Sequence, residues 1–338
     1  MICNTFRFKA FYLAILSLLL IIGCSQPTPS ADAPSQANGS EAPAEPISLR
    51  FAAGSQSGSW YPLAVNITEM MKKNMENLEQ VSIEQGGGVS NVMSVNQGQT
   101  DIGFSHGMSI IDGVNGLPPF PQKNENLKYV LSLDPYYMQI AVFKDSGIES
   151  VEDLRGKKIN VGPKSATTEV AARMVLEAYG MSFEDMGSVQ HLSHADSVEQ
   201  MKDGRFDALF WVMGAPFAVM TDLTQSKDIK FLSIPEDKIE QLAAKNPALL
   251  KGTLKAGTYK GLDQDVTTFK TPLAVIANQN TSEELVYEAA KSIYNGLSEL
   301  VLVNPSLKEI TPEDLSVDIG LPMHPGAEKF FQELAEAK

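Results

Sequence analysis

The chain has 338 residues, of which 41 are acidic and 27 basic, and its formal net charge is -14 at pH 7. This balance argues against nucleic acid or an anionic membrane surface as a partner, because like charges repel. It does not exclude a small anionic ligand, since binding of a small molecule depends on local groups.

The first 23 residues have the pattern of a secretory signal peptide. Arg7 and Lys9 precede an uncharged run from Ala10 to Gly23, which is too short to span a membrane. The run ends in the letters IIGC, which resemble the lipobox of bacterial lipoproteins and place the cysteine at Cys24. That resemblance implies cleavage before Cys24 and lipid attachment to its sulfur, and several acyl chains on one residue give stable anchoring. We therefore expect an extracytoplasmic, lipid-anchored protein.

The segment behind the predicted lipidation site has the composition of a tether. Residues 24–46 contain five prolines and almost no large apolar side chain, so they bury too little surface to fold. The other cysteine, Cys3, would be removed with the signal peptide, which leaves no disulfide partner for Cys24.

About 290 residues remain after the tether, more than a single hydrophobic core usually serves. A pattern of strand, glycine-rich turn and helix runs through the first part of this segment and then begins again. We therefore expect two lobes with a cleft between them. Lobe one is predicted over residues 47–142 and 271–338, and lobe two over residues 143–270.

In lobe one, strands are predicted at residues 47–54, 81–85, 101–105, 129–133 and 138–143. A helix after the first strand is indicated by the helical spacing of Leu63, Ile67, Met70 and Met71. A second, short helix is predicted to run to Gln97 with Ser90 as its N-cap.

In lobe two, strands are predicted at residues 158–162, 188–192, 206–213 and 229–234, and a strand at 271–278 returns to lobe one. A helix follows the first of these strands, with an apolar stripe through Val170, Met174 and Ala178. From Thr281 onward the chain is predicted to be helical, with breaks at Pro305, Pro322 and Pro325. This alternation predicts an α/β protein with open, mostly parallel sheets, in which ligands bind beyond the carboxyl ends of the strands.

Three glycine-rich turns precede predicted helices: GSQSGS at residues 54–59, GGGVSN at 86–91 and GPKSATT at 162–168. A helix N-terminus presents unpaired amides and a partial positive charge, so an anion placed there is stabilised. Each turn also offers hydroxyl groups, among which Ser59 is a better candidate than Ser57 because it is nearer its helix. Gly and Ser also serve as plain turn and cap residues, but three such turns on matching strand ends favour a binding site.

Aromatic side chains stand beside these turns and could form the apolar walls of a pocket. They are Trp60, Tyr61, Tyr136, Tyr137 and Trp211. Each of them could equally be a core residue.

The chain lacks the sequence motifs of common enzymes. It contains no phosphate-binding G-x-x-x-x-G-K-[ST] loop and no G-x-S-x-G elbow, and GGGVSN is not a dinucleotide fingerprint. The H-x-x-H pair of His191 and His194 lies in a segment predicted as a strand, where residues three apart face opposite sides, so we expect no shared metal. Neither catalysis nor a cofactor is predicted.

Six segments, in chain order, resemble the TAXI solute-binding proteins, which are the receptors of one class of tripartite ATP-independent periplasmic (TRAP) transporters. They are GSQSGSWYPLA, GGGVSNVMSVNQGQTDIGFSH, SVEDLRGKKINVGPKSATTE, MKDGRFDALFWVMGAPFAV, LKAGTYKGLDQDVTT and MHPGAEKFFQE. The resemblance implies a type II periplasmic-binding-protein fold, in which two α/β lobes are joined by crossing hinge strands and close on a ligand.

The resemblance also implies which residues bind the ligand. One wall would comprise Gly54, Ser55, Ser59, Trp60, Tyr61, Gly87, Gly88, Val89, Ser90, Ser105, His106, Tyr136 and Tyr137. The other would comprise Lys164, Ser165, Ala166, Thr167, Thr168, Trp211, Met213 and Gly214. Trp60 and Lys164 replace smaller residues that are commoner in the family, and Lys164 could add a point charge for a carboxylate.

The resemblance further implies a small anionic or zwitterionic ligand, an organic acid or amino acid of the glutamate or 2-oxoglutarate type. A monomeric receptor would deliver it to a TRAP permease driven by an ion gradient. Two alternatives stay open: a receptor for a sensor kinase or an ABC importer, and a secreted enzyme that uses the same cleft.

Overall fold

The computed structural model describes residues 45–56 and 58–337. The predicted signal peptide, Cys24, almost all of the tether and Ser57 lie outside these residues. The described residues belong to one compact unit. Within it, no helix combines the length and the apolar character that crossing a membrane requires.

The described strands form one sheet in the order β2-β1-β3-β10-β4-β7-β5-β6, with β8 beside β4 and β9 beside β10. On one side lie β1 (Ile47–Ala52), β2 (Leu78–Glu84) and β3 (Ile102–His106), and on the other β5 (Lys158–Asn160), β6 (Ser188–Gln190) and β7 (Ala208–Met213). Neighbours within each set are parallel. The predicted α/β class is confirmed.

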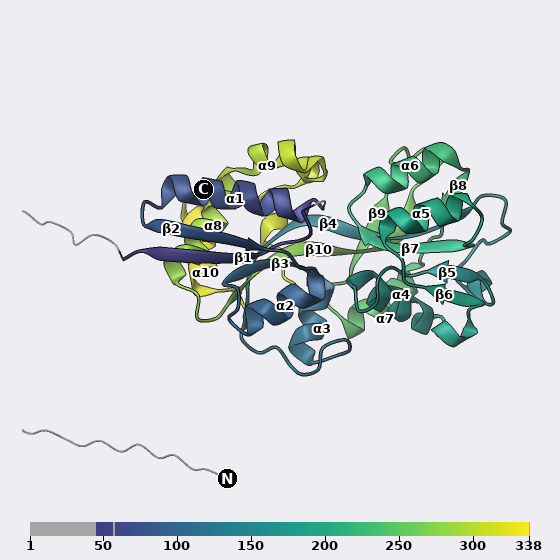
Figure 1. Ribbon diagram of the computed structural model, residues 1–338, viewed down its shortest axis with the longest axis horizontal. Coiled ribbons are helices and arrows are strands. Elements are labelled where there is room, and N and C mark those ends of the chain that lie inside the picture. The colour runs from purple at the N-terminus through teal and green to yellow at the C-terminus, as the bar shows by residue number, and fades with distance from the viewer. Residues whose placement is uncertain (1–44, 57, 338) are drawn as a thin grey trace, which may run out of the picture. The chain divides into compact units, whose positions relative to one another are not determined.

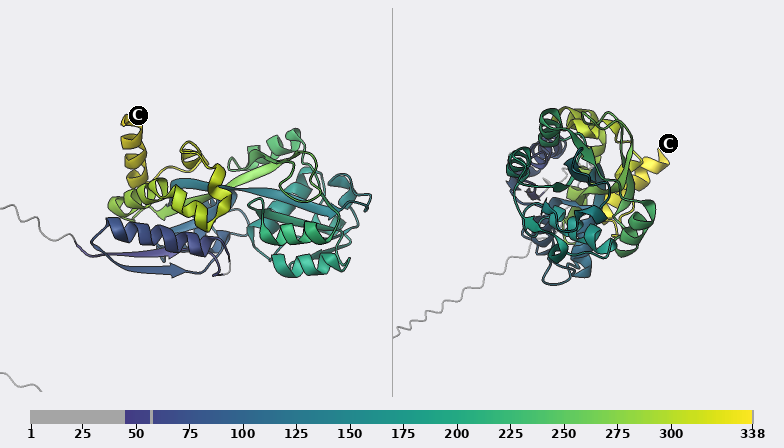
Figure 2. Two further views of the ribbon diagram at one scale, coloured as in Figure 1. Left: turned by 90° about the horizontal axis from the view of Figure 1, so that it is seen from above. Right: turned by 90° about the vertical axis from the view of Figure 1, so that its right-hand side faces the viewer.

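Two long strands, β4 (Leu127–Phe143) and β10 (Val266–Asn278), connect these parallel sets and run antiparallel to each other. The first half of β10 pairs with β9 (Leu250–Leu254), and its second half pairs with β3. The second half of β4 pairs with β7 and with β8 (Ile229–Phe231). Figure 1 shows these strands passing between two groups of elements, and Figure 2 shows the same arrangement from two further sides.

The prediction of two separate strands at residues 129–133 and 138–143 is wrong, because β4 is continuous over 17 residues. Pro135 does not interrupt the strand, because it pairs with Pro272 of β10. Neither proline has an amide hydrogen, so neither one could donate a hydrogen bond to the neighbouring strand at this position. The register between β10 and β4 slips by one residue just after Pro272.

Helices flank both parallel sets. The first group of elements holds α1 (Trp60–Asn74), α2 (Gly88–Asn96), α3 (Gly107–Asn115), α8 (Glu283–Asn295), α9 (Leu297–Val303), α10 (Pro325–Glu336) and the short turns η3 (Pro305–Glu309) and η4 (Asp314–Ser316). The second group holds α4 (Thr167–Ala178), α5 (His194–Lys202), α6 (Ala218–Ser226), α7 (Glu236–Lys245), η1 (Glu152–Leu154) and η2 (Phe183–Asp185). In Figure 1, α1 and α9 lie on one side of β1–β3, and α2 and α3 lie on the other.

Some local predictions are confirmed and others are wrong. The predicted apolar positions of α1 are all buried. Helix α2 begins two residues before the predicted cap, with Gly87 as its N-cap. Ser90 instead lies in the first turn, where its Oγ accepts a hydrogen bond from the amide of Gly87 at 2.9 Å.

The apolar stripe predicted for α4 is displaced by one residue. Its buried apolar positions are Ala171, Ala172, Val175 and Leu176, whereas Val170, Met174 and Ala178 are only partly buried at the edge of the core. The helix has two adjacent apolar rows, and periodicity alone does not tell which row faces the sheet.

The segment SVQHLSH is not one strand, so the geometric argument about its histidines is wrong. Strand β6 ends at Gln190, and α5 begins at His194. Ser193 caps this helix, because its Oγ accepts from the amide of Asp196 at 3.2 Å.

Candidate functional site

A cavity of about 650 Å³ lies where the two groups of elements meet. Its lining from the first group comprises Gly54, Ser55, Gly58, Ser59, Trp60, Gly86, Gly87, Gly88, Val89, Ser90, Met93, His106 and Tyr136. Its lining from the second group comprises Pro163, Lys164, Ser165, Ala166, Thr167, Thr168, His194, Val212, Met213 and Phe217. The three glycine-rich turns singled out in the sequence therefore meet at one cavity.

The N-terminal ends of four described helices reach this cavity. The first residues of α1, α2, α4 and α5 are Trp60, Gly88, Thr167 and His194, and all four line it. Unpaired amides and a partial positive charge accompany each helix start, so the cavity favours an anionic group.

The turn before α2 lies very close to the start of α4. A Cβ atom placed on Gly88 would lie 2.7 Å from Thr167 Oγ1 and 2.9 Å from His106 Nδ1. Nearby, the hydroxyls of Ser109 and Thr167 are 2.9 Å apart and share a hydrogen bond. Only glycine permits this approach without a shift of its neighbours.

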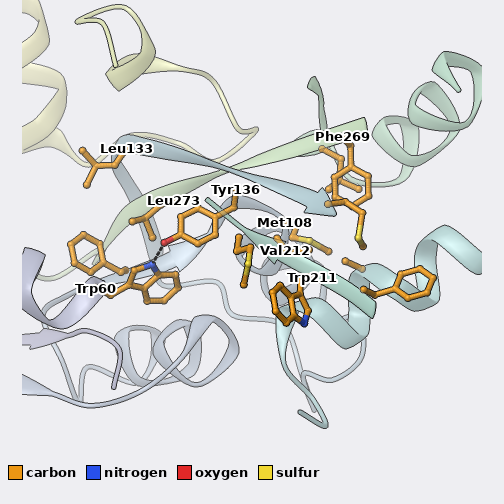
Figure 3. Close-up of a cluster of buried hydrophobic side chains, with 14 of the residues drawn as sticks. Trp60, Met108, Leu133, Tyr136, Trp211, Val212, Phe269 and Leu273 are labelled. Atoms are coloured by element: carbon orange, nitrogen blue, oxygen red, sulfur yellow. Dashed lines mark hydrogen bonds between the residues drawn. The ribbon is translucent and has the colours of Figure 1, made fainter. Parts of the chain in front are cut away.

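An aromatic cluster forms the first wall of the cavity. The indole Nε1 of Trp60 donates to Tyr136 Oη at 2.7 Å, as the dashed line in Figure 3 shows. Ser59 Oγ lies 3.5 Å from the same hydroxyl. The His106 ring packs 4.9 Å from both the Trp60 ring and the Tyr136 ring. Burial raises the pKa of Tyr136, so its hydroxyl keeps its proton.

Two histidines line the cavity from opposite groups. His106 is 8% exposed, and among the described residues neither of its ring nitrogens has a hydrogen-bond partner. His194 is half-buried, and its Nε2 atom likewise has no partner there. Burial lowers the pKa of His106 to about 3, with a smaller contribution from His194, and lowers the pKa of His194 to about 4. Both imidazoles are therefore neutral at neutral pH.

Several predicted hydroxyl contacts are already bonded within the protein. Thr168 Oγ1 accepts from the amide of Val212 at 3.3 Å, and Ser90 Oγ both accepts from and donates to Gly87. Ser105 Oγ donates to the carbonyl of Gly88 at 2.8 Å. These side chains shape the turns around the cavity.

Five predicted site residues do not line the cavity: Tyr61, Ser105, Tyr137, Trp211 and Gly214. Tyr137 follows Tyr136 on β4, so its side chain points to the other face of the strand, where it contacts Gly252. Trp211 is fully buried (Figure 3). Its ring centroid lies 5.0 Å from that of His194, which does line the cavity. Tyr61 packs against the hydrophobic core.

The lining residues that the sequence did not predict are Gly58, Gly86, Met93, Pro163, His194, Val212 and Phe217. In the sequence, His194 stands out only as half of an H-x-x-H pair, and Phe217 has no local signal besides its place after the strand that holds Trp211. In the part of the chain that the structure describes, no group of three or more His, Cys, Asp or Glu residues is placed to hold a metal ion.

Lys164 is the one residue among the described lining residues that carries a full charge at neutral pH. It lies in an exposed turn whose next residue, Ser165, has a left-handed φ of 60°. The Ser165 amide donates to Glu169 Oε2 at 2.7 Å, and Glu169 also pairs with Arg173. Glu169 itself does not line the cavity, and its carboxylate is engaged by the Ser165 amide and by Arg173.

Two buried carboxyl groups lie near the junction of the two groups of elements. Asn246 Nδ2, after α7, donates to Asp112 Oδ1 of α3 at 2.9 Å. Asp134 of β4 accepts from the hydroxyl of Ser306 in η3. Burial raises the pKa of each carboxyl to about 6.

Comparison with solved structures relates this architecture to known proteins of the same fold. PhnD1 from Prochlorococcus marinus, solved with methylphosphonate, aligns with a TM-score of 0.52 at 12% identity over 86% of this chain and 98% of that chain. XAC2383 from Xanthomonas citri, solved with chloride ion, aligns with a TM-score of 0.50 at 12% identity over 86% and 96%. At these identities the likeness shows the fold alone.

In sequence, the chain is 28% identical over 137 residues to the arginine-binding extracellular protein ArtP of Bacillus subtilis (strain 168), which is 38% of this chain and 47% of ArtP. The chain thus spans about half the length of this curated relative. The model of the NMT1-like family matches residues 51–334, nearly all of the described part. The chain therefore belongs to the NMT1-like family.

Proposed function

We propose that this protein is an extracytoplasmic receptor that binds a small organic anion in the cavity and delivers it to a membrane transporter. One observation carries the proposal: the N-termini of α1, α2, α4 and α5 and the side chain of Lys164 converge on a single cavity whose described lining has no carboxylate. Such a site attracts negative charge, and its aromatic wall can cover the apolar part of a ligand.

The two relatives differ in the charge of the ligand that their names give. The structure of PhnD1 is a complex with methylphosphonate, a small organic anion. ArtP is named as an arginine-binding protein. Arginine is a cation, and we expect this chain to differ from ArtP in that respect because Lys164 would repel a guanidinium group.

In this proposal, binding needs only a movement of two lobes of the chain toward each other. We propose that residues 47–142 with 271–338 form one lobe, that residues 143–270 form the other, and that β4 and β10 serve as the hinge. The Ser109–Thr167 and Asp112–Asn246 hydrogen bonds join elements of the two proposed lobes and would favour a closed form. No covalent step is involved, and the ligand should leave unaltered.

We propose a TRAP permease as the transporter, on the strength of the six segments that resemble TAXI receptors. An ABC importer would need the same kind of receptor. Uptake of the ligand in cells that lack either the neighbouring permease genes or the neighbouring ATPase genes separates the two. We further propose a monomer attached to the membrane through lipid on Cys24.

Native mass spectrometry of the protein purified from its host tests the receptor function. We expect one small molecule per chain, released unchanged on denaturation. Recovery of a chemically altered molecule after incubation with excess ligand would show an enzyme instead. The absence of bound small molecules, together with no thermal shift across monocarboxylates, dicarboxylates and amino acids, would overturn the receptor function.

A further inference from the structure

Within the part of the chain that the structure describes, the two imidazoles that line the cavity have unpaired nitrogens, whereas several of the lining hydroxyls are already hydrogen-bonded. Thr167, Thr168 and Ser90 already make hydrogen bonds within the protein, and the indole nitrogen of Trp60 is bonded to Tyr136. By contrast, neither ring nitrogen of His106, nor Nε2 of His194, has a partner among the described residues. Buried polar atoms in folded proteins almost always have partners, so these nitrogens point to groups that a ligand would supply.

The neutral state of the two imidazoles defines which groups of a ligand can bond them. A neutral imidazole has one N–H donor and one acceptor nitrogen, so it can bond a carbonyl or a hydroxyl as well as a carboxylate. His106 ends β3 in the first group, and His194 begins α5 in the second. A ligand that bonds both imidazoles would therefore touch both proposed lobes.

The described lining offers no carboxylate that would balance an ammonium group. It contains Lys164 and the N-termini of α1, α2, α4 and α5 but, among the residues described, no Asp or Glu. A buried cation without a counter-charge loses its hydration and gains little in return, and the partial charges of the helix ends repel it.

We infer that the cavity selects an organic acid that carries a carbonyl or hydroxyl group and no ammonium group, and that His106 and His194 are the residues that hydrogen-bond it. This inference rests on the proposed receptor function and narrows its ligand. Among small acids, it separates 2-oxo and 2-hydroxy acids from the amino acids of the same carbon skeleton.

Matched pairs of ligands test the selectivity directly. Calorimetric titration of the full protein would compare 2-oxoglutarate with glutamate, pyruvate with alanine, and 3-methyl-2-oxobutanoate with valine. We expect the best oxo acid to bind at least tenfold more tightly than its amino partner. Equal or tighter binding of the amino acid would overturn the inference while leaving the receptor function intact. Failure of every compound to bind would overturn the small-acid receptor itself.

Substitution of the histidines tests their contribution. His106→Phe and His194→Phe keep an aromatic ring but remove the nitrogens, and each should weaken binding of the preferred acid at least tenfold. His191→Gln is the control, because His191 lies off the cavity lining and a glutamine can still donate to the carbonyl of Gly162, as His191 Nδ1 does at 3.2 Å. The affinity of this variant should stay within twofold of the wild type. Thermal unfolding of each variant checks that it is folded.

Two further variants of His106 are compared if His106→Phe does not fold. His106→Gln retains a donor and an acceptor and should bind the acid more tightly than His106→Leu, which retains neither. Unchanged affinity in both His106→Leu and His194→Phe would overturn the assignment of these residues.

Discussion

Trp60 and Tyr136 are 76 positions apart in the chain, yet the indole nitrogen of one donates to the hydroxyl of the other at 2.7 Å. This bond joins the first residue of α1 to the strand β4, which runs between the two groups of elements. Both side chains are largely buried and both line the cavity. The first wall of the cavity is therefore held by a hydrogen bond that no local sequence pattern specifies.

Tyr136→Phe should destabilise the protein, because the buried Trp60 Nε1 then lacks its acceptor. Leaving a buried donor unsatisfied costs about 1–3 kcal/mol of unfolding free energy. Trp60→Phe removes the same hydrogen bond, but the unfolding free energy lost with this bond should be smaller, because the Tyr136 hydroxyl retains Ser59 as a neighbour. Urea unfolding of the two single variants and of the double variant measures the coupling, and purely additive losses would contradict the importance of this bond.

Gly88→Ala should weaken ligand binding at least tenfold with little loss of unfolding free energy. The added methyl group would lie 2.7 Å from Thr167 Oγ1, so the start of α4 must move away from α2. Gly87→Ala adds the same methyl group to the neighbouring lining residue without a clash, because a Cβ at Gly87 has no heavy atom within 4 Å and its φ of -160° suits any residue. This variant separates the contact with Thr167 from the effect of added bulk in the cavity. Calorimetric titration compares the two variants, and equal affinities would contradict a close approach in the ligand-bound form.

Lys164→Met should weaken binding of an anionic ligand a few-fold and should reduce the dependence of affinity on salt. The effect is modest because this lysine is exposed, and exposed charge pairs contribute roughly 0.2–1 kcal/mol. Titrations at low and high ionic strength measure both quantities. Lys123→Met, an exposed lysine off the cavity lining, is the control. A wild-type salt dependence in Lys164→Met would show that this charge does not act on the ligand.

Stability should respond to pH through two opposing sets of buried groups. The pKa of His106 is lowered to about 3 and that of His194 to about 4, from 6.5, so the unfolded chain binds more protons below pH 6.5 and stability falls on acidification. The pKa of Asp112 and of Asp134 is raised to about 6 from 3.8, so their contribution is full below pH 3.8 and is lost as pH rises through 6.

Asp112→Asn removes one of the opposing carboxyls and keeps an oxygen for Asn246. Between about pH 6 and pH 4 the variant should lose stability on acidification more steeply than the wild type. The difference in slope should approach about 1.4 kcal/mol of unfolding free energy per pH unit. Urea unfolding at several pH values in this range gives the slopes, and parallel curves would contradict a raised pKa for Asp112.

Cys24→Ala should abolish lipid attachment and leave an uncleaved or unacylated chain. The reason is chemical, since the proposed thioether to diacylglycerol needs the sulfur of this residue. Intact mass and membrane fractionation report the outcome, with Cys3→Ala as the control that should be processed normally. Normal acylation of the Cys24→Ala protein would contradict the lipobox.

Much of the candidate site follows from local patterns. The turns at Gly54, Gly86 and Gly162 precede helices in the structure as predicted, because a glycine-rich turn, a cap and an apolar helical spacing are properties of neighbouring residues. The α/β class followed from the same local alternation. These features need no knowledge of the distant chain.

Tertiary structure alone decided which side chains face the cavity and which polar atoms lack partners. Trp211 is in the core, whereas Phe217 and His194 line the cavity. The continuity of β4 depends on Pro272, a residue far away in sequence. The physical reason is that a hydroxyl or an imidazole acquires its chemistry from whatever packs against it, and for Thr167 and His106 those neighbours come from other parts of the chain. The sequence by itself determined where the turns are, and folding determined that His106 and His194 keep nitrogens beside them that have no partner among the described residues.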